Sequence, residues 1–440
     1  MPTIATPLRA ASAALCLLLL APSPTHAQGS TLDSTEKARA REMLGTAKSA
    51  IRSTYYDKAF HGIDLDAHFK AADAKIDTAT SLGHAYAIIA QALIDFGDSH
   101  TYFLPPERPA SYDYGWQYGM VGDGCFVLAV KPGSNAEAKG IKPGDRITQI
   151  GAFTPSRAEL WKVRYLYHVL SPKSVLKVAV QSPGGQPRAI DINAKVTQER
   201  AVVEVSLDAL IESGPGAMGD PIVRVNRNAM VGDIAISKLS TFAVADSSAD
   251  KMMDDMLKGA SSLVLDLRGN GGGLIKTLEL VAGRFFDHDV KMADRVGRKN
   301  MKPMVAKKRK TPFTGKLVVL VDADSASASE ILARVVQLEK RGVVIGDRSS
   351  GSVMQAEQGM GVLEGTDGVI PYAFSITNAD LIMADGKSLE HGGVVPDEIV
   401  LRSPEDLAAG RDPALARAVA LLGGTLDPVA AGKMFPVEWK

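Results

Sequence analysis

Residues 317–340 read LVVLVDADSASASEILARVVQLEK, and this stretch decides the fold class. Five apolar residues at 317–321 predict a buried strand, and an apolar pattern with helical spacing predicts a helix over 328–340. The same order recurs upstream, where a buried strand expected at 263–267 runs into RGNGGG before a helix expected over 274–286. Short apolar strands separated by helices indicate an α/β core with parallel pairing.

The alternation of strands and helices continues through residues 198–440, which we expect to form one domain. Further strands are expected at 231–239 and 343–345, and a further helix at 249–259. Ligands of such folds bind beyond the carboxyl ends of the strands. Two polar loops, RGNGGG and DADSASASE, follow strands at such ends, so a functional site is expected there.

Ser327 stands where the second of these loops enters its helix. Unpaired N–H groups and the helix dipole favour negative charge at such a position, as on an alkoxide or a tetrahedral oxyanion. A helix cap is the alternative interpretation, since a serine followed by Glu330 three residues later forms a capping box. The loop alone leaves both interpretations open.

Residues 1–27 have the pattern of a secretory signal: one charge at Arg9, a short apolar core, and Thr25-His26-Ala27 as the cleavage site. The apolar core over 10–21 is shorter than the roughly 20 residues that a membrane-spanning helix needs. Cys16 does not indicate a lipid anchor, because Leu15 is too large for a lipoprotein cleavage site. The sequence therefore predicts a periplasmic or secreted protein, cut after Ala27, with no integral membrane anchor.

Net charge and cysteine count limit which partners and covalent cross-links the protein can have. Without Arg9 the balance of 50 basic and 50 acidic residues becomes about −1, which does not favour nucleic acid as a partner. Removal of Cys16 leaves Cys125 as the one cysteine, so no intramolecular disulfide is expected. No metal or other cofactor is expected either. The length is sufficient for two or three domains.

Two regions precede the α/β core. Residues 33–98 have helical periodicity and end before Pro105 and Pro106, which predicts a helical N-terminal domain over 28–110. Beyond it, the segment GDGCFVLAVKPGSNAEAKGIKPGDRITQIGA predicts strands and a short helix between turns at Pro132-Gly133 and Pro143-Gly144.

This second region resembles a PDZ domain over residues 112–195, and we place the domain at 111–197. The resemblance rests on the phrase PGSNAEAKGIKPGDRITQI, in which turn and apolar positions agree together. It implies that a peptide binds as an added strand, with its terminal carboxylate held by backbone N–H groups. The expected carboxylate loop is Tyr118-Gly119-Met120-Val121, and a plain hairpin turn is the alternative.

LDLRGNGGG, SASASE and the later phrase EHGGVVPD occur together and in this order. In this the chain resembles the C-terminal processing peptidases and their tricorn-type relatives, over most of its length. The resemblance implies a multidomain α+β protein with a crotonase-like ββα catalytic core, in which Ser327 is the nucleophile. It also implies an oxyanion hole formed by the N–H of Ala328 and of one glycine among Gly271, Gly272 and Gly273. A phosphate-binding glycine loop is a weak alternative, because the Gly-Lys-Ser/Thr ending is missing.

The general base departs from one branch of that family. The serine–lysine peptidases place a lysine 25 residues after the nucleophile, but this chain has Ser352 there, and a hydroxyl is no base near neutral pH. Tricorn-type relatives use a Ser-His pair far upstream, which Ser99 and His100 match in FGDSH. The resemblance thus implies His100 as the base, oriented through Ser99 by Glu390. A surface glutamate in a turn is the alternative for Glu390.

The expected function is that of an exported serine endopeptidase, hydrolysing peptide bonds through an acyl-enzyme on Ser327. Its partners would be protein or peptide substrates, whose tails the PDZ-like domain recognises. The alternative is a binding protein for peptides or apolar ligands on the same scaffold, since a fold alone does not establish catalysis. The substrate, the oligomeric state and the effect of the PDZ-like domain on the site stay open.

Overall fold

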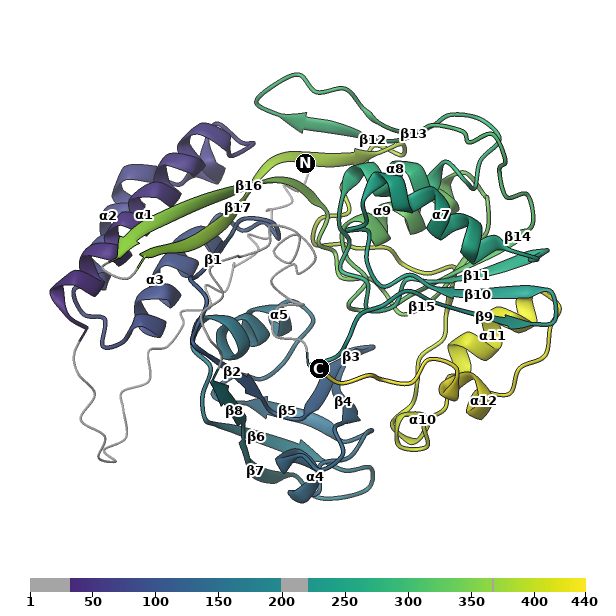
Figure 1. Ribbon diagram of the computed structural model, residues 1–440, viewed down its shortest axis with the longest axis horizontal. Helices are drawn as coiled ribbons and strands as arrows, with labels where there is room; N and C mark the ends of the chain where they lie inside the picture. Colours follow the sequence, from purple (N-terminus) through teal and green to yellow (C-terminus); the bar gives the residue numbers. More distant parts are fainter. Residues whose placement is uncertain (1–31, 199–220, 366–367) are drawn as a thin grey trace, which may run out of the picture.

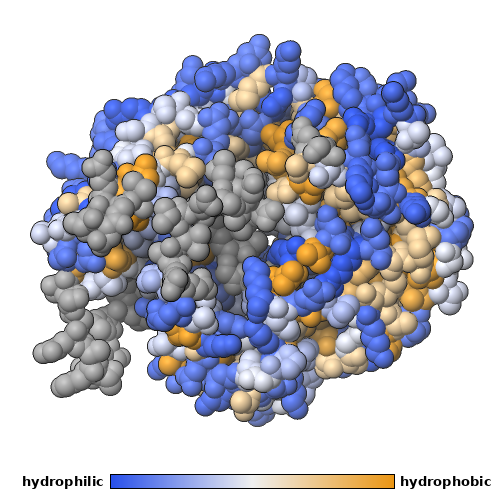
Figure 2. All heavy atoms as spheres, in the orientation of Figure 1, coloured by the Kyte–Doolittle hydropathy of each residue, from blue (hydrophilic) through white to orange (hydrophobic). Residues whose placement is uncertain are grey.

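The computed structural model describes residues 32–198, 221–365 and 368–440. The expected signal, residues 1–27 with its cleavage site, lies outside these ranges. Within them, no helix is both long enough and apolar enough to cross a membrane. Figure 2 shows hydrophilic residues over much of one face of the molecule, with separate hydrophobic patches between them.

Three helices build the N-terminal region (Figure 1): α1 (Ser34–Thr54), α2 (Leu65–Ile76) and α3 (Leu82–Ile94). A capping box starts α1, because Asp33 Oδ1 accepts from the N–H of Glu36 while Asp33 N–H donates to the Glu36 carboxylate. Its buried residues recur at helical spacing: Ala40, Met43, Leu44, Ala47 and Ile51. Helices thus occupy the segment in which the sequence predicts them, joined by the one-turn helix η1 (Phe60–Gly62).

A five-stranded antiparallel sheet forms the second region, in the order β3-β4-β5-β6-β7. Its elements are β3 (Trp116–Val121), β4 (Gly124–Val130), α4 (Asn135–Ala138), β5 (Arg146–Ile150), α5 (Leu160–Arg164), the π-helical turn η2 (Tyr165–Leu170), β6 (Val175–Gln181) and β7 (Arg188–Asn193). A separate pair, β2 (Ala110–Asp113) with β8 (Lys195–Gln198), joins the two ends of this region.

The expected carboxylate loop at Tyr118-Gly119-Met120-Val121 is wrong as a loop. These residues lie in β3 and pair with β4, and the turn follows at 122–123. Gly119 is closely packed within the strand, because a Cβ on it would lie 3.0 Å from Leu128 Cδ1 and 3.3 Å from Arg164 Nη2.

A six-stranded sheet is the centre of the third region, in the order β18-β15-β14-β11-β10-β9. The strands are β9 (Arg227–Val231), β10 (Ile234–Lys238), β11 (Ser262–Asp266), β14 (Lys316–Val321), β15 (Val343–Gly346) and β18 (Glu398–Ile399). All neighbours pair in parallel except β9 and β10. The parallel core is therefore confirmed. The strand expected over 231–239 is shorter than predicted, because residue 231 ends β9 and the second strand of the hairpin, β10, covers Ile234–Lys238.

Helices cover both faces of this sheet (Figure 1). On one face lie α7 (Asp246–Leu257), α8 (Ile275–Ala282) and α9 (Ala328–Leu338); on the other lie α11 (Pro413–Leu421) and α12 (Pro428–Lys433), with α10 (Pro404–Ala408) before them. Successive residues of β14 alternate between the two cores: Leu317, Val319 and Val321 face α9, whereas Val318 and Leu320 face α11. Burial on both faces explains why such strands are continuous apolar runs.

A second, antiparallel sheet was not predicted. It consists of β1 (Tyr102–Leu104), β12 (Val290–Gly297), β13 (Met304–Ala306), β16 (Met354–Gly365) and β17 (Gly368–Met383). The long strand β17 pairs with β16 along one edge and with β1 and β12 along the other. One face of the β16–β17 hairpin packs against the N-terminal helices through Leu363, Tyr372, Phe374 and Ile376. This sheet therefore brings the segment after α3 to the third region.

Candidate active site

Ser327 occupies the turn between β14 and α9, as the N-cap residue of that helix. Its φ of 55° is unusual for a residue other than glycine and marks local strain of the kind found at functional sites. The turn is held from both sides, because Ser327 N–H donates to Ser352 O at 2.9 Å and to Glu330 Oε2 at 3.0 Å. The backbone at Ser327 is thus fixed by partners that lie on two different segments.

Glu330 is the anchor of this turn. It is fully buried, and each carboxylate oxygen accepts two hydrogen bonds. Oε1 accepts from Ser349 Oγ at 2.6 Å and Gly351 N at 2.7 Å, and Oε2 accepts from Ser327 N and, at 2.9 Å, Ser352 N. Burial raises the pKa of Glu330 to about 7, although these donors favour the ionised form.

The other two serines of SASAS connect the turn to the glycine loop. Ser325 Oγ donates to Leu267 O at 2.9 Å, and Ser329 Oγ donates to Asn270 O at 2.9 Å. Both side chains are fully buried. Their hydroxyls therefore have structural partners, which leaves Ser327 as the serine of this motif that lines a cavity.

The glycine loop 269–273 approaches Ser327 so closely that a side chain would not fit. A Cβ on Gly272 would lie 2.7 Å from Ser327 Cβ and 3.1 Å from Ala328 N. Gly272 N–H already donates to Asn270 Oδ1 at 2.9 Å. Of the three glycines expected at an oxyanion hole, Gly271 and Gly273 line the cavity beside Ala328.

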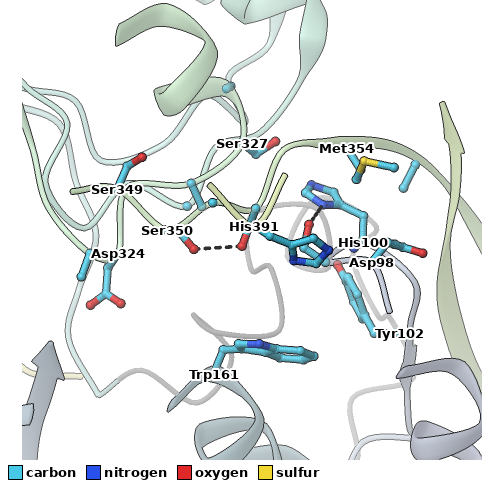
Figure 3. A pocket seen from close by; sticks show the side chains of 18 of the residues that line it. Asp98, His100, Tyr102, Trp161, Asp324, Ser327, Ser349, Ser350, Met354 and His391 are labelled. Atoms are coloured by element: carbon cyan, nitrogen blue, oxygen red, sulfur yellow. Dashed lines mark hydrogen bonds between the residues drawn. The ribbon is translucent and has the colours of Figure 1, made fainter. Parts of the chain in front are cut away.

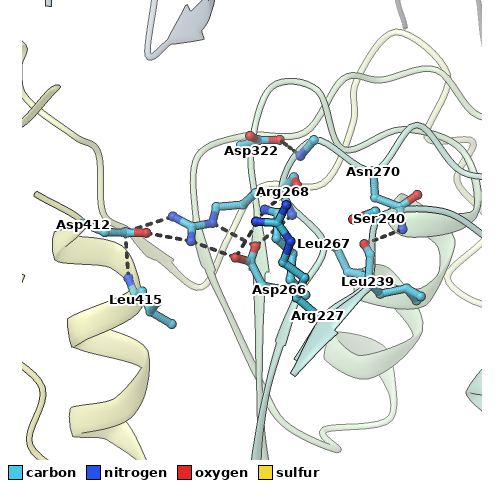
Figure 4. A network of polar contacts seen from close by, with 12 residues as sticks. Arg227, Leu239, Ser240, Asp266, Leu267, Arg268, Asn270, Asp322, Asp412 and Leu415 are labelled. Carbon is cyan, nitrogen blue, oxygen red and sulfur yellow. Dashed lines mark hydrogen bonds and ion pairs between the residues drawn. The ribbon is translucent and has the colours of Figure 1, made fainter. Parts of the chain in front are cut away.

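An ion-pair network fixes the start of this loop (Figure 4). The Arg268 guanidinium bridges Asp266 and Asp412, with Nη2 at 2.8 Å from a carboxylate oxygen of each. Burial opposes ionisation of Asp266, but Arg268 and Lys238 hold its pKa below the usual range. Because Asp412 caps α11, the network connects the glycine loop to the helix on the opposite face of the sheet.

His100 belongs to a hydrogen-bonded chain that begins at Glu390. Ser99 N–H donates to Glu390 Oε1 at 2.7 Å, and Ser99 Oγ donates to Oε2 at 2.9 Å. Ser99 Oγ also lies 2.8 Å from His100 Nδ1. Since the Ser99 proton points to the carboxylate, Ser99 Oγ accepts the Nδ1 proton, and this assignment leaves Nε2 as the basic nitrogen.

Burial affects the protonation of this chain in opposite ways. It lowers the pKa of His100 to about 4, which the negative charge of Asp98 partly opposes. It raises the pKa of Glu390, although N–H groups of Val353 and Ser99 stabilise the carboxylate. At neutral pH the imidazole is therefore uncharged and able to accept a proton.

Ser327 and His100 line one cavity of about 770 Å³ together with Ser99, Asp98 and Ser352. No hydrogen bond joins Ser327 to His100 within the described part of the chain. Such bonds are often long or poorly aligned without substrate. The structure thus brings together three of the four expected catalytic residues at the cavity wall, and Glu390 lies behind Ser99.

Position 352 does not supply a base. Ser352 Oγ lies 2.8 Å from Ser350 Oγ, and its backbone holds Ser327 and Glu330. The one lysine among the residues that line this cavity is Lys162, whose ammonium pairs with Glu159 at 3.3 Å.

Three site residues were missed in the sequence. His391 follows Glu390 and is largely exposed at the cavity, and Figure 3 shows its ring with that of His100 in the space between Ser327 and Trp161. Asp98, next to Ser99, is buried; its Oδ1 accepts from His100 N–H at 2.9 Å, and its Oδ2 has no partner among the described residues. Their adjacency to the expected residues was the available signal.

The third, Asp324, connects the turn at Ser327 to the five-stranded region. Arg164 Nη1 lies 2.8 Å from Asp324 Oδ1, and Arg164 also donates to Tyr118 O. Asp324 precedes Ser327 by three residues. This ion pair therefore links β3 and α5 with the loop that leads into Ser327.

Comparisons with known proteins agree with the class that this fold and cavity define, a serine-type peptidase. Residues 233–400 match the model of peptidase family S41, so this segment is similar to that family. It is 26% identical over 336 residues to the chloroplastic C-terminal processing peptidase of Tetradesmus obliquus, covering 71% of this chain and 69% of that protein. It is equally 26% identical to the chloroplastic carboxyl-terminal-processing peptidase 1 of Arabidopsis thaliana, covering 72% of this chain and 63% of that protein.

A similarity in fold extends over most of the chain. The crystal structure of mature CPAF superposes with a TM-score of 0.60 at 13% sequence identity, covering 85% of this chain and 95% of that one. At this identity the superposition concerns the fold alone.

Proposed function

We propose that this protein is an exported serine endopeptidase in which Ser327 attacks the peptide bond and His100 is the general base. The observation that carries the proposal is the chain Glu390–Ser99–His100, which ends at the cavity that Ser327 lines. Export rests on the signal pattern of residues 1–27.

The proposed reaction uses His100 Nε2 twice. The nitrogen takes the proton of Ser327 Oγ as that oxygen bonds to the substrate carbonyl carbon, and it then gives the proton to the departing amine. The N–H groups of Ala328 and of Gly271 or Gly273 would stabilise the oxyanion. A water molecule then attacks the acyl-enzyme, with its proton passing to Nε2, and releases the acid and Ser327.

The five-stranded region has the proposed role of a PDZ-like domain that recognises substrate tails. Strand β3 is the end strand of its sheet, which is the kind of edge to which a peptide adds. The ion pair of Arg164 with Asp324 gives this edge a direct connection to the nucleophile turn. Peptide binding at β3 would thus change the position of the loop that leads into Ser327, through the Arg164–Asp324 ion pair.

Labelling with a fluorophosphonate, together with casein cleavage, tests the proposal. Ser327→Ala should abolish both, and His100→Ala should lower turnover by about 10³-fold or more. Ser352→Ala is the matched control, since among the described residues its Oγ hydrogen-bonds to the Ser350 hydroxyl alone, and it should retain most activity. Labelling that survives Ser327→Ala would exclude this nucleophile.

A binding protein without turnover is the second candidate. It is favoured by the missing hydrogen bond between Ser327 and His100, and by apolar residues on the cavity wall, among them Ile275, Leu278 and Leu381. Tight binding of an apolar peptide by wild-type protein, with no cleavage at high protein concentration, would establish it.

A further inference from the structure

The second sheet has one face whose residues align in rows across three strands. Tyr102 of β1 pairs with Ser375 of β17, which pairs in turn with Gln358 of β16. The next row along the strands consists of Leu104, Ala373 and Met360, and the row after it of Pro371 and Val362. Side chains two residues apart share a face of a strand, so these rows form one continuous surface.

We name this surface, formed by Leu104, Ala373, Met360, Pro371 and Val362, the β16 shelf. Its two β16 side chains are unusually exposed for apolar residues, Met360 at 53% and Val362 at 57%. None of the five residues carries a charge. Leu104 and Ala373 are buried, at 4% and 2%, so the exposed part of the shelf is its β16 edge at Met360 and Val362. Neighbouring exposed apolar side chains beside a cavity indicate a binding site.

The opposite face of the same hairpin packs against the N-terminal helices. There Gly359 and Gly361 allow the rings of Phe374 and Tyr372 to lie flat, since a Cβ at either glycine would lie under 2.5 Å from a ring carbon. These rings pack against the N-terminal helices. Strand β16 is therefore held firmly through its other face. Met360 and Val362 are exposed because they point away from that packed interface.

The shelf is continuous with the proposed active site. Tyr102, Ala356 and Gln358 line the cavity that contains Ser327 and His100. Strand β16 begins at Met354, two residues after Ser352, and runs from there to the shelf. The carbonyl of Ser352 accepts from Ser327 N–H. The outer edge of β16 pairs with no other strand among the described residues.

We propose that the β16 shelf binds an extended, unfolded polypeptide, with uncharged apolar side chains at alternate positions several residues from the bond that is cleaved. This rests on the proposed function, which places the cleaved bond at Ser327. From Ala356 to Met360 a strand rises about 13 Å, so a substrate of three residues, about 10 Å long, would not reach the shelf. Selection on the shelf would therefore act on long substrates only.

The test compares Met360→Lys and Val362→Lys with Val296→Lys, which changes an equally exposed valine on β12 of the same sheet. For an unfolded apolar peptide of about 20 residues, each shelf variant should lower kcat/KM by about tenfold, mainly through KM. For a chromogenic tripeptide ester all three variants should match wild type. Equal losses on both substrates, or no loss on the long one, would overturn the proposal.

Two further measurements separate other causes. Binding of the same fluorescein-labelled peptide to Ser327→Ala, with and without each shelf substitution, reports on the shelf without turnover. If wild type binds the peptide at the shelf but cleaves nothing, the shelf stands and the proposed function fails. If sedimentation shows a dimer that Met360→Lys dissociates, a second copy of this chain covers the shelf, and the proposal is wrong.

Discussion

Glu390 holds Ser99 through two hydrogen bonds, from the backbone N–H to Oε1 at 2.7 Å and from Oγ to Oε2 at 2.9 Å. The pair of bonds fixes both the position of Ser99 and the direction of its hydroxyl proton. That direction determines which nitrogen of His100 carries a proton. A carboxylate 291 positions away in the sequence thus controls the tautomer of the proposed base.

Glu390→Gln should therefore impair catalysis more than binding. The amide NH2 can donate to Ser99 Oγ, which reverses the hydrogen bond and no longer favours the Nδ1 tautomer. We expect kcat to fall about 10- to 100-fold with KM nearly unchanged. Steady-state kinetics measure both, with Glu357→Gln on exposed β16 surface as the matched control. A rise in KM at constant kcat would mean that Glu390 contributes to substrate binding.

The pH dependence of kcat/KM tests the environment of His100. The base must be neutral, and burial lowers its pKa to about 4, so activity should persist below pH 6 and fall only as the pH approaches that value. Asp98→Asn keeps an acceptor for His100 N–H but removes the charge that favours the imidazolium. The acid limb should then shift to lower pH, and kcat should fall by about tenfold. An acid limb near pH 6.5 in wild type would contradict the lowered pKa of His100.

The parallel sheet and the turn at Ser327 could be predicted because their signals are local. The run 317–321 is apolar on both faces and is followed directly by the loop and helix that contain Ser327. The second sheet lacks such a signal. Strand β16 reads MQAEQGMGVLEG, in which glycines and polar residues hide the alternation, and β1 has only three residues.

Contacts between segments far apart in the sequence explain why the roles of Glu330 and Gly119 could not be predicted. In the sequence, Glu330 has the position of the second residue of a capping box. Its carboxylate also accepts hydrogen bonds from Ser349, Gly351 and Ser352. These partners lie about 20 residues away, so no local sequence pattern indicates the contacts. Gly119 was expected in a carboxylate loop because of the resemblance to a PDZ domain, whereas it lies within β3, packed close to Arg164. Tertiary packing decided both positions.

Contact between the glycine loop and the nucleophile can be tested by Gly272→Ala. The new Cβ would collide with Ser327 Cβ and Ala328 N, so we expect fluorophosphonate labelling to fall by more than about 100-fold. Gly269→Ala is the control in the same loop. It also has a positive φ, of 73°, but its Cβ would meet only Arg224 Nη1 at 3.5 Å. It should cost about 1 kcal/mol of stability and little labelling.

If both variants lose labelling equally, the strain of a positive φ at a side-chain residue is the cause, and the contact with Ser327 is not. Circular dichroism of each variant shows whether the fold is retained, so a lost fold is not mistaken for a displaced nucleophile.

Glu330 should make stability depend on pH in a particular direction. Its pKa rises from 4.5 to about 7 on folding, so the folded state binds the proton more tightly than the unfolded state. The free energy of unfolding should therefore decrease as the pH rises from about 4.5 to 7 and change no further above that. Glu330→Gln removes this slope, and because its NH2 faces N–H donors it should also destabilise the protein by about 2–4 kcal/mol at neutral pH.

Urea unfolding of wild type and variant across this pH range measures both effects. Glu107→Gln, a substitution of an exposed glutamate, is the matched control and should reproduce the wild-type curve. A variant curve parallel to that of wild type throughout would mean that the four hydrogen-bond donors keep Glu330 ionised in the folded protein. In that case the turn at Ser327 is held by a buried charge at every pH at which the enzyme works.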